Sequence, residues 1–347
     1  MKRFLPLGLM LVFVAACSLR PVGPSPTPAT ESMVTLTPLP FATTTPVTAA
    51  ATPTEVPTLA PSATVKPLIP DFAHIVILIF ENKEYGTIIG DKALPNFNHY
   101  AKSYTLLNAY YSPTHPSLPN YLALIGGDTF GVKNDCPGNH CYVDAKSLPD
   151  LIEASGRTWR TYQERMPSAC FLGDAFKYAQ KHNPFIFFTP IRENAERCQR
   201  SVVPLDQLDG DLAAKALPNF VFITPDLCNS SHGLSSSIDC PPPVADAWVG
   251  VMVKKLQNYL DGDGQPYLII ITWDEGQGNH GCCGLPEDGA GGRVPTMLIS
   301  PQVKNGFQDE TPYTHYSLLK TISAAWHLPY LGHAADPENV LMLAPWK

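Results

Sequence analysis

Two apolar runs that end abruptly in acidic residues limit the fold of this chain more than any other feature. The run HIVILIF over residues 74–80 is followed by Glu81-Asn82, and the run YLIIITW over residues 267–273 is followed by Asp274-Glu275. Continuous apolar runs of this length are typical of parallel strands that are buried on both faces. Open α/β sheets bind ligands beyond the carboxyl ends of such strands. We therefore predict an α/β fold with a mostly parallel central sheet flanked by helices, and with both acidic pairs at one edge of the sheet.

The acids at that edge predict a divalent metal site. Adjacent carboxylates are costly to bury unless a cation neutralises them, and carboxylates from separate strands can share one cation. Oxygen ligands suit Mg, Ca or Mn, and nearby imidazoles would admit Zn. Neither Asp274 nor Glu275 is needed to end a strand, which favours a functional role for the pair.

The first 70 residues have the pattern of a leader and a tether. The segment LPLGLMLVFVAAC follows Lys2-Arg3 and is too short to span a bilayer, so residues 1–17 are predicted to be a signal peptide. The stretch VAAC resembles a bacterial lipobox in which Cys17 is lipidated; ordinary secretion with a chance cysteine is the alternative. Residues 18–70 are rich in Pro, Thr and Ala and are predicted to be a disordered linker. Residues 71–347 are then predicted to form one folded domain, and the whole is expected to be an extracytoplasmic, membrane-anchored lipoprotein.

The net charge argues against a nucleic-acid partner, and the number of cysteines indicates disulfides formed outside the cytoplasm. The formal net charge of -7 provides no basic field for a polyanion, so nucleic acid is not expected as a partner. Eight cysteines follow residue 71, and an even number outside the cytoplasm favours disulfides. The short loops Cys136 to Cys141 and Cys228 to Cys240 are the expected local pairs. A zinc site is the alternative, although the CxxC spacing that favours one is absent.

A serine at the start of a predicted helix is the first candidate for chemistry. In SPTHPSLPNYLALIGG, residues 112–127, prolines precede an apolar helical stretch and Ser117 is expected at the N-cap. Such a serine is commonly only a cap, worth about 1 kcal/mol. The same position also aims amide N–H groups at an anion beside the hydroxyl, which is how a phosphate is held and a serine oxyanion stabilised.

Three further polar residues lie at predicted element ends. The apolar run PNFVFITP ends at Asp226, and His232 follows in a polar loop. His315 precedes a helix expected to start near Tyr316, after a strand in RVPTMLISP. Each could equally be a turn, solvated or capping residue.

Taken together, these fragments resemble the bacterial phosphoesterase family that contains acid phosphatases and phospholipases C, within the alkaline-phosphatase-like fold. The matching segments span almost everything from Phe72 to Leu331. They are FENKEYGTIIG, THPSLPNYLALIGG, ITPDLCNSSHG, DAWV, TWDEGQG, VPTMLISP and THYSLLKTI. The long inserts of the larger phospholipases C are missing, so the chain is more similar to the compact acid phosphatase branch.

The resemblance implies a role for each matching residue. The implied metal ligands are Glu81, Asn82, Ser117, Asp274 and Glu275, for one or two divalent ions (Mg, Ca, Mn or Zn). Ser117 is the implied nucleophile, with Thr114 as the fallback. His232 and His315 are expected to act catalytically on the phosphoryl group, or to complete a second metal position with Asp226. Substrate contacts are assigned to Asn120, His115 and Asp226, and His280 is a weaker candidate.

These roles predict a metal-dependent extracellular phosphatase that hydrolyses phosphate monoesters through a phosphoserine at Ser117. The expected substrate is a small phosphate ester or a phospholipid head group. One alternative is a phosphodiesterase or phospholipase C-type hydrolase that uses the same serine and metal. The other is a non-catalytic surface binding protein.

Overall fold

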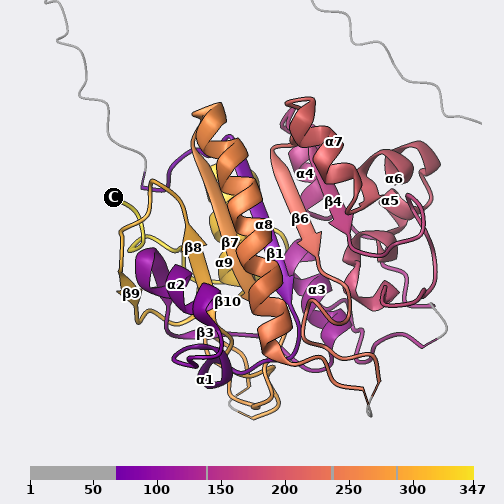
Figure 1. Cartoon of the computed structure of the whole chain (residues 1–347). Helices are drawn as coiled ribbons and strands as arrows, with labels where there is room; N and C mark the ends of the chain where they lie inside the picture. The colour runs from indigo at the N-terminus through magenta and orange to yellow at the C-terminus, as the bar shows by residue number, and fades with distance from the viewer. Residues whose placement is uncertain (1–67, 138–139, 236–237, 287) are drawn as a thin grey trace, which may run out of the picture. The chain divides into compact units, whose positions relative to one another are not determined.

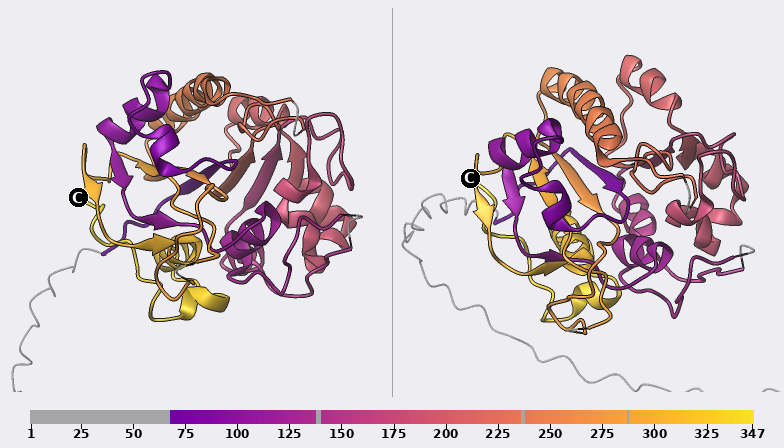
Figure 2. Two further views of the ribbon diagram at one scale, coloured as in Figure 1. Left: turned by 90° about the horizontal axis from the view of Figure 1, so that it is seen from below. Right: turned by 60° about the horizontal axis from the view of Figure 1, so that its bottom comes forward.

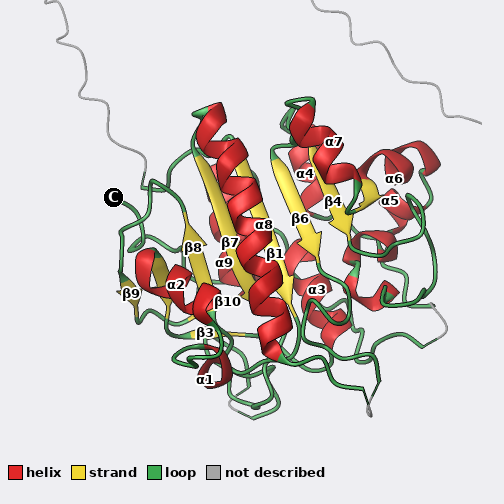
Figure 3. Cartoon of the chain, in the orientation of Figure 1, coloured by secondary structure: helices red, strands yellow, loops and turns green. Residues whose placement is uncertain are grey.

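An eight-stranded sheet forms the centre of the computed structural model, which describes residues 68–347 except 138–139, 236–237 and 287 (Figures 1 and 3). The predicted signal peptide, and the predicted linker up to residue 67, lie outside the described residues. No helix within the described part is both long and apolar enough to cross a membrane. In spatial order the strands are β5 (Val202–Pro204), β4 (Trp159–Gln163), β6 (Phe220–Thr224), β1 (His74–Phe80), β7 (Tyr267–Trp273), β8 (Thr296–Ile299), β2 (Thr105–Leu107) and β9 (Gln308–Asp309).

Strands β5, β4, β6, β1 and β7 are parallel, and β8 runs antiparallel to both β7 and β2. A separate two-stranded ribbon pairs β3 (Tyr110–Tyr111) with β10 (Tyr313–Thr314). Every residue of β1 and β7 is buried, as expected for strands covered on both faces. The predicted α/β class with a mostly parallel central sheet is therefore confirmed.

The register of β1 and β7 fixes where the acidic pairs emerge. Phe80 is paired with Trp273 at the carboxyl ends of the two strands. The next residues along the chain, Glu81 and Asp274, therefore leave the sheet side by side. The sequence boundaries of both strands were predicted to within one residue, because each run is apolar throughout and stops at an acid.

Helices cover both faces of the sheet. On one face α8 (Pro242–Asp263) packs against α2 (Pro95–Ser103), and on the other α9 (His315–Ala325) packs against α3 (Ser117–Gly126). Figure 2 shows α8, in orange, and α9, in yellow, on opposite sides of the strands. The shorter helices are α1 (Tyr85–Ile88), α4 (Leu148–Ala154), α5 (Thr189–Arg192), α6 (Ala195–Ser201) and α7 (Gln207–Ala213), with 3-10 turns η1 (Gln180–His182), η2 (Pro184–Phe187) and η3 (Gly332–Ala335).

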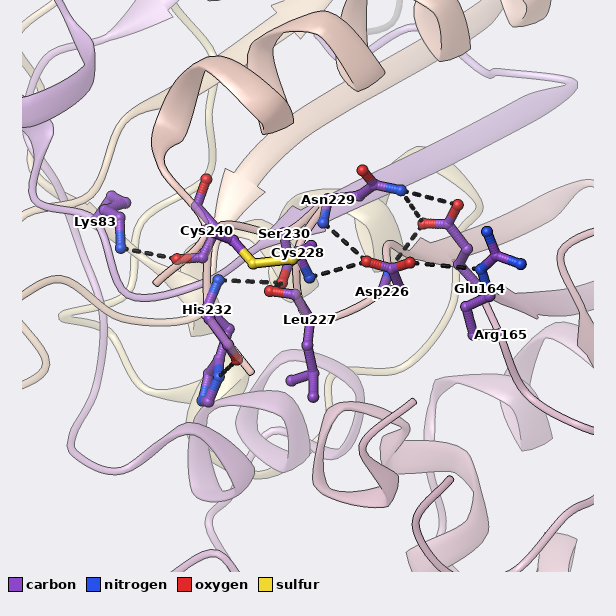
Figure 4. The surroundings of a disulfide bond; sticks show 12 residues. Lys83, Glu164, Arg165, Asp226, Leu227, Cys228, Asn229, Ser230, His232 and Cys240 are labelled. Atoms are coloured by element: carbon purple, nitrogen blue, oxygen red, sulfur yellow. Dashed lines mark hydrogen bonds and ion pairs between the residues drawn. A yellow bond between two sulfur atoms is a disulfide. The ribbon is translucent and has the colours of Figure 1, made fainter. Parts of the chain in front are cut away.

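Four disulfides join the eight cysteines of the described domain. They are Cys136–Cys141, Cys170–Cys198, Cys228–Cys240 and Cys282–Cys283. The disulfide prediction, including its two short loops, is confirmed. Each bond lies in a segment outside the strands, and Figure 4 shows the one that closes the loop after β6.

Candidate active site

The five predicted metal ligands converge at the carboxyl edge of the sheet. They are Glu81 and Asn82 after β1, Asp274 and Glu275 after β7, and Ser117 at the start of α3. The hydroxyl oxygen of Ser117 lies 3.2 Å from Glu81 Oε2, 3.5 Å from Asn82 Oδ1 and 3.4 Å from Glu275 Oε1. The backbone N–H of Asn82 donates to Asp274 Oδ1 at 3.2 Å. Glu81 and Asp274 are fully buried, and Glu275 is 4% exposed. The structure thus brings together the whole set that the sequence analysis expected as metal ligands.

The spacing of these oxygens fits a divalent cation. Ligands at about 2.0–2.6 Å from an ion with octahedral angles are themselves roughly 2.9–3.7 Å apart, which is the range observed around Ser117. The Asn82 side-chain oxygen also faces other acceptors; turning the amide over would let its nitrogen donate to Glu81 Oε2 and Asp274 Oδ1, each at 3.2 Å. The remaining ligand atoms are carboxylate and hydroxyl oxygens, which are the ligands that hard divalent cations prefer. The donor set therefore suits Mg, Ca or Mn.

Burial makes the charged forms of these acids costly without such an ion. Desolvation raises the pKa of Glu81 to about 7, although Lys181 and the hydrogen bond from Tyr121 act in the opposite direction. Burial, followed by the charges of Glu81 and Glu275, raises the pKa of Asp274 well above its usual range. Tyr121, from α3, donates its hydroxyl hydrogen to Glu81 Oε1. The site is therefore built to hold positive charge.

Local structure explains the position of Ser117. Helix α3 begins at Ser117 itself, with Pro116 as the N-cap residue, so the serine occupies the first helical position and not the predicted N-cap. The side chain of Asn120 accepts from the N–H of Thr114 at 3.0 Å and donates to the carbonyls of Thr114 and Pro116. Asn120 thereby fixes the turn that presents the serine, and its polar atoms are used within the protein.

His182 is a site residue that sequence analysis missed. Its Nε2 lies 3.3 Å from Glu81 Oε2, but the geometry forms no hydrogen bond, and this nitrogen is buried without a partner. The ring stacks on Tyr121 and contacts the ring of His232, with centroids 5.1 Å apart. Burial, followed by the nearby Lys181 and His232, lowers the pKa of His182 well below its usual value.

Glu81, His182 and His232 form a second group that could hold a metal. One ligand atom from each lies within 4.8 Å of the others. A neutral imidazole is the ligand form of histidine, and burial keeps His182 neutral. Glu81 and His232 were candidates from sequence, whereas His182 lies in a segment without periodicity and carries no sequence signal.

The loop after β6 positions His232, and Asp226 supports that loop. Asp226 Oδ1 accepts from the N–H groups of Cys228 and Asn229, and Oδ2 lies 3.6 Å from Arg165 Nε. Figure 4 shows the Asp226 carboxylate among these neighbours, with His232 on the other side of the loop. The contacts of Asp226 are therefore those of a turn residue, which was one of its two interpretations.

The remaining predicted residues surround the acids. His315 is fully buried: its Nδ1 lies 3.0 Å from the Tyr110 hydroxyl and its Nε2 lies 2.8 Å from the Asp274 carbonyl oxygen. These contacts place it behind the acidic pair, where it orients Asp274. His115 Nδ1 lies 2.5 Å from Glu275 Oε2, and this bond raises the pKa of His115.

Two weaker candidates lie further from the reaction centre. The Thr114 hydroxyl donates to the His115 carbonyl at 3.1 Å, and His280 is exposed in the loop after β7. The hydrogen bond of Thr114 to the neighbouring backbone does not favour a role as nucleophile. The exposed position of His280 does not favour a role as metal ligand.

Comparison with known proteins identifies the class to which this site belongs. The family model of the Phosphoesterase family matches residues 90–329. The chain therefore belongs to the Phosphoesterase family. It is 32% identical over 269 residues to an acid phosphatase of Aspergillus fumigatus, in a match that covers 75% of this chain and 56% of that protein. This chain thus spans little more than half of that relative's length.

A second relative matches over most of both chains. The chain is 30% identical over 277 residues to a phosphatidylinositol-3-phosphatase of Mycobacterium tuberculosis, covering 78% of this chain and 83% of the relative. These relatives include fungal and bacterial proteins, so a specifically bacterial branch is not confirmed.

Solved structures show the same fold. The structure of Ps i-CgsB in complex with k-i-k-neocarrahexaose superposes with a TM-score of 0.51 at 16% identity, covering 78% of this chain and 77% of that one. A second crystal structure of Ps i-CgsB also matches, with a TM-score of 0.51 at 16% identity, covering 78% of this chain and 77% of that one.

Proposed function

We propose that this protein is a metal-dependent phosphatase that hydrolyses phosphate monoesters through a phosphoserine at Ser117. The observation that carries the proposal is the Ser117 hydroxyl at the first position of α3, 3.2–3.5 Å from oxygens of Glu81, Asn82 and Glu275. Membership of the Phosphoesterase family and the acid phosphatases among the relatives support the same reaction.

Glu81, Asn82, Ser117, Asp274 and Glu275 would hold the cation. When bound, a divalent ion lowers the pKa of a ligated hydroxyl and neutralises charge on phosphoryl oxygens. His182 and His232 would either bind phosphoryl oxygens or join Glu81 at a second ion, which gives one or two ions per chain. Imidazoles beside the carboxylates extend the candidate ions to Zn.

The chain's own residues then account for both chemical steps. The Ser117 hydroxyl gives its proton to solvent as its oxygen attacks phosphorus, the bond from phosphorus to the leaving alcohol breaks, and the alcohol takes up a proton. Where His232 does not hold a second ion, it is the donor we assign for that proton, and it regains a proton from solvent. Water then attacks phosphorus from the side that the alcohol left, releasing phosphate and returning a proton to Ser117.

His115 and His315 act through the acids they contact. His115 holds Glu275 and His315 holds the backbone of Asp274, so both keep the ligand set in place. We assign the same kind of support to Asn120, which fixes the turn before Ser117, and to Asp226, which fixes the His232 loop.

A hydrolase for lipid or diester substrates is the second candidate. One relative is named a phosphatidylinositol-3-phosphatase and another, at 27% identity, a hemolytic phospholipase C. A lipid anchor at Cys17, with residues 18–70 as a tether, would keep the domain near such substrates. The four disulfides support an extracytoplasmic location.

The test is an ester panel measured on purified protein with and without a chelator. We expect p-nitrophenyl phosphate to be hydrolysed faster than its bis ester and phosphatidylcholine, and chelation to abolish turnover until a divalent ion is restored. Acid-quenched enzyme should contain phosphoserine at Ser117. A protein that binds the ion yet hydrolyses no ester across a wide pH range would instead be a binding protein.

A further inference from the structure

A pocket of about 330 Å³ is lined by one lysine, Lys181, and by His232. Its lining includes Asp135, Asp174, Tyr178, Lys181, Leu227 and His232. The ring of His232 contacts that of His182, whose Nε2 faces Glu81. The pocket therefore adjoins the place where a phosphoryl group on Ser117 would lie.

Asp135 connects Lys181 to the helix that begins with the serine. Its Oδ1 accepts from the backbone N–H of Leu118, the residue after Ser117, at 3.1 Å, and its Oδ2 accepts from Lys181 Nζ at 2.6 Å. One carboxylate thus bridges an amide of the first turn of α3 and an ammonium group. Both are donors that bind phosphoryl oxygens in proteins.

Lys181 retains capacity for a further acceptor. An ammonium group has three N–H donors, and the bond to Asp135 uses one of them. The Lys181 side chain is 21% exposed, so the remaining donors need not lose a full hydration shell to reach a ligand. The other lysine near the acids, Lys83, donates to the carbonyl oxygen of Ser231 at 2.9 Å and supports the His232 loop.

Monoesters and diesters differ in the group that such a lysine would bind. A phosphate monoester carries up to two negative charges over three non-bridging oxygens, whereas a diester carries one charge over two. We propose that Lys181, positioned by Asp135, binds the additional charged oxygen and so selects monoesters over diesters. This inference rests on the proposed function, because it concerns the substrate of the same serine.

The test compares two esters with the same leaving group in Lys181→Met, which keeps most of the side-chain volume and removes the charge. We expect kcat/KM for p-nitrophenyl phosphate to fall by about 10- to 100-fold, the range for a lost charge-assisted hydrogen bond. For bis(p-nitrophenyl) phosphate we expect a change of less than about threefold, because no bond is lost. Lys181→Arg keeps the positive charge, so its preference for the monoester over the diester should lie between those of Lys181→Met and the wild type. Lys255→Met removes a lysine of α8 that pairs with Asp209 at 2.5 Å, and it should leave both rates unchanged.

Asp135→Asn provides a second variant that keeps the lysine. It removes the charge that positions Lys181 and should shift the ratio in the same direction by a smaller factor. Inhibition by inorganic phosphate should weaken in Lys181→Met, whereas inhibition by dimethyl phosphate should not. Equal losses for both esters, or an unchanged ratio, overturn the role of Lys181 while leaving the phosphatase intact. A wild-type protein that hydrolyses neither ester overturns the proposed function as well.

Discussion

The carboxylate of Glu84 accepts a hydrogen bond from the backbone N–H of Gly278 at 2.9 Å, and this contact joins the two loops that carry the acids. Glu84 lies three residues after Glu81, and Gly278 lies three residues after Glu275. The same carboxylate accepts from the N–H groups of Gln277 at 2.9 Å and Arg293 at 3.0 Å. A Cβ at position 276 would come within 2.3 Å of Glu84 Oε2, so glycine is needed there for the approach.

Replacing Glu84 should weaken cation binding without touching a ligand. Glu84→Gln exchanges one acceptor oxygen for a donor, which faces N–H groups and cannot accept from them. Loss of outer-shell support of this kind typically costs about 10- to 100-fold in metal affinity, and we expect a loss in that range. Calorimetric titration with Mn²⁺ measures it. Glu196→Gln, an exposed acid on α6, is the matched control, and equal affinities in the two variants would contradict the prediction.

Ser117→Ala should remove turnover while the fold is kept. Loss of a nucleophile typically costs on the order of 10⁴-fold or more in kcat, and the phosphoenzyme should no longer be trapped on acid quench. Thr114→Ala tests the fallback hydroxyl. It should reduce kcat/KM by less than about tenfold, because the hydrogen bond that is lost runs to the His115 carbonyl and not to a carboxylate of the site. Normal phosphatase turnover in Ser117→Ala would refute the assignment of the nucleophile.

Cation affinity should rise with pH up to neutrality. In the ion-free protein burial raises the pKa of Glu81 to about 7, so below this pH an incoming cation must displace a proton. Affinity should therefore increase by up to about tenfold per pH unit between pH 5 and 7 and level off above it. Titrations at pH 5, 6, 7 and 8 measure this slope. A flat profile across the whole range would show that Glu81 is not a ligand or is not protonated.

His315 should make folding stability fall in acid. Burial lowers the pKa of His315 from its ordinary value of 6.5 to about 4, so between these pH values the unfolded chain binds a proton that the folded protein does not. Stability from this residue is complete above pH 6.5 and is lost towards pH 4, by up to about 3 kcal/mol. Urea unfolding of wild type and His315→Gln at pH 4.5 and 7 measures it.

The raised pKa of Glu81 acts in the opposite sense, stabilising the ion-free protein below pH 7, but it is common to both proteins and cancels in the comparison. The variant should lose less stability on acidification than the wild type does. Equal losses in the two proteins would contradict a neutral buried His315.

Sequence alone was sufficient to locate the candidate residues that lie at the ends of strands or at the start of a helix. Glu81, Asp274 and Ser117 were found because apolar runs and a helix start mark their positions, and the parallel register brings the two strand ends together. Lys181, His182 and Glu84 were missed as site residues because they lie in short turns whose contacts come from residues distant in the chain. For Asp226 and His315 the pattern located the element end but could not give the direction of the side chain.

The acids and the proposed selecting lysine come from different stretches of the chain. Glu81 and Asp274 follow β1 and β7, at the middle of the sheet, whereas Asp135, Lys181 and His182 belong to the segment between α3 and β6. Changes within that segment can alter which ester is accepted while the ion remains in place. In the proposed scheme, substrate choice and ion binding could therefore be altered independently, because each depends on its own stretch of the sequence.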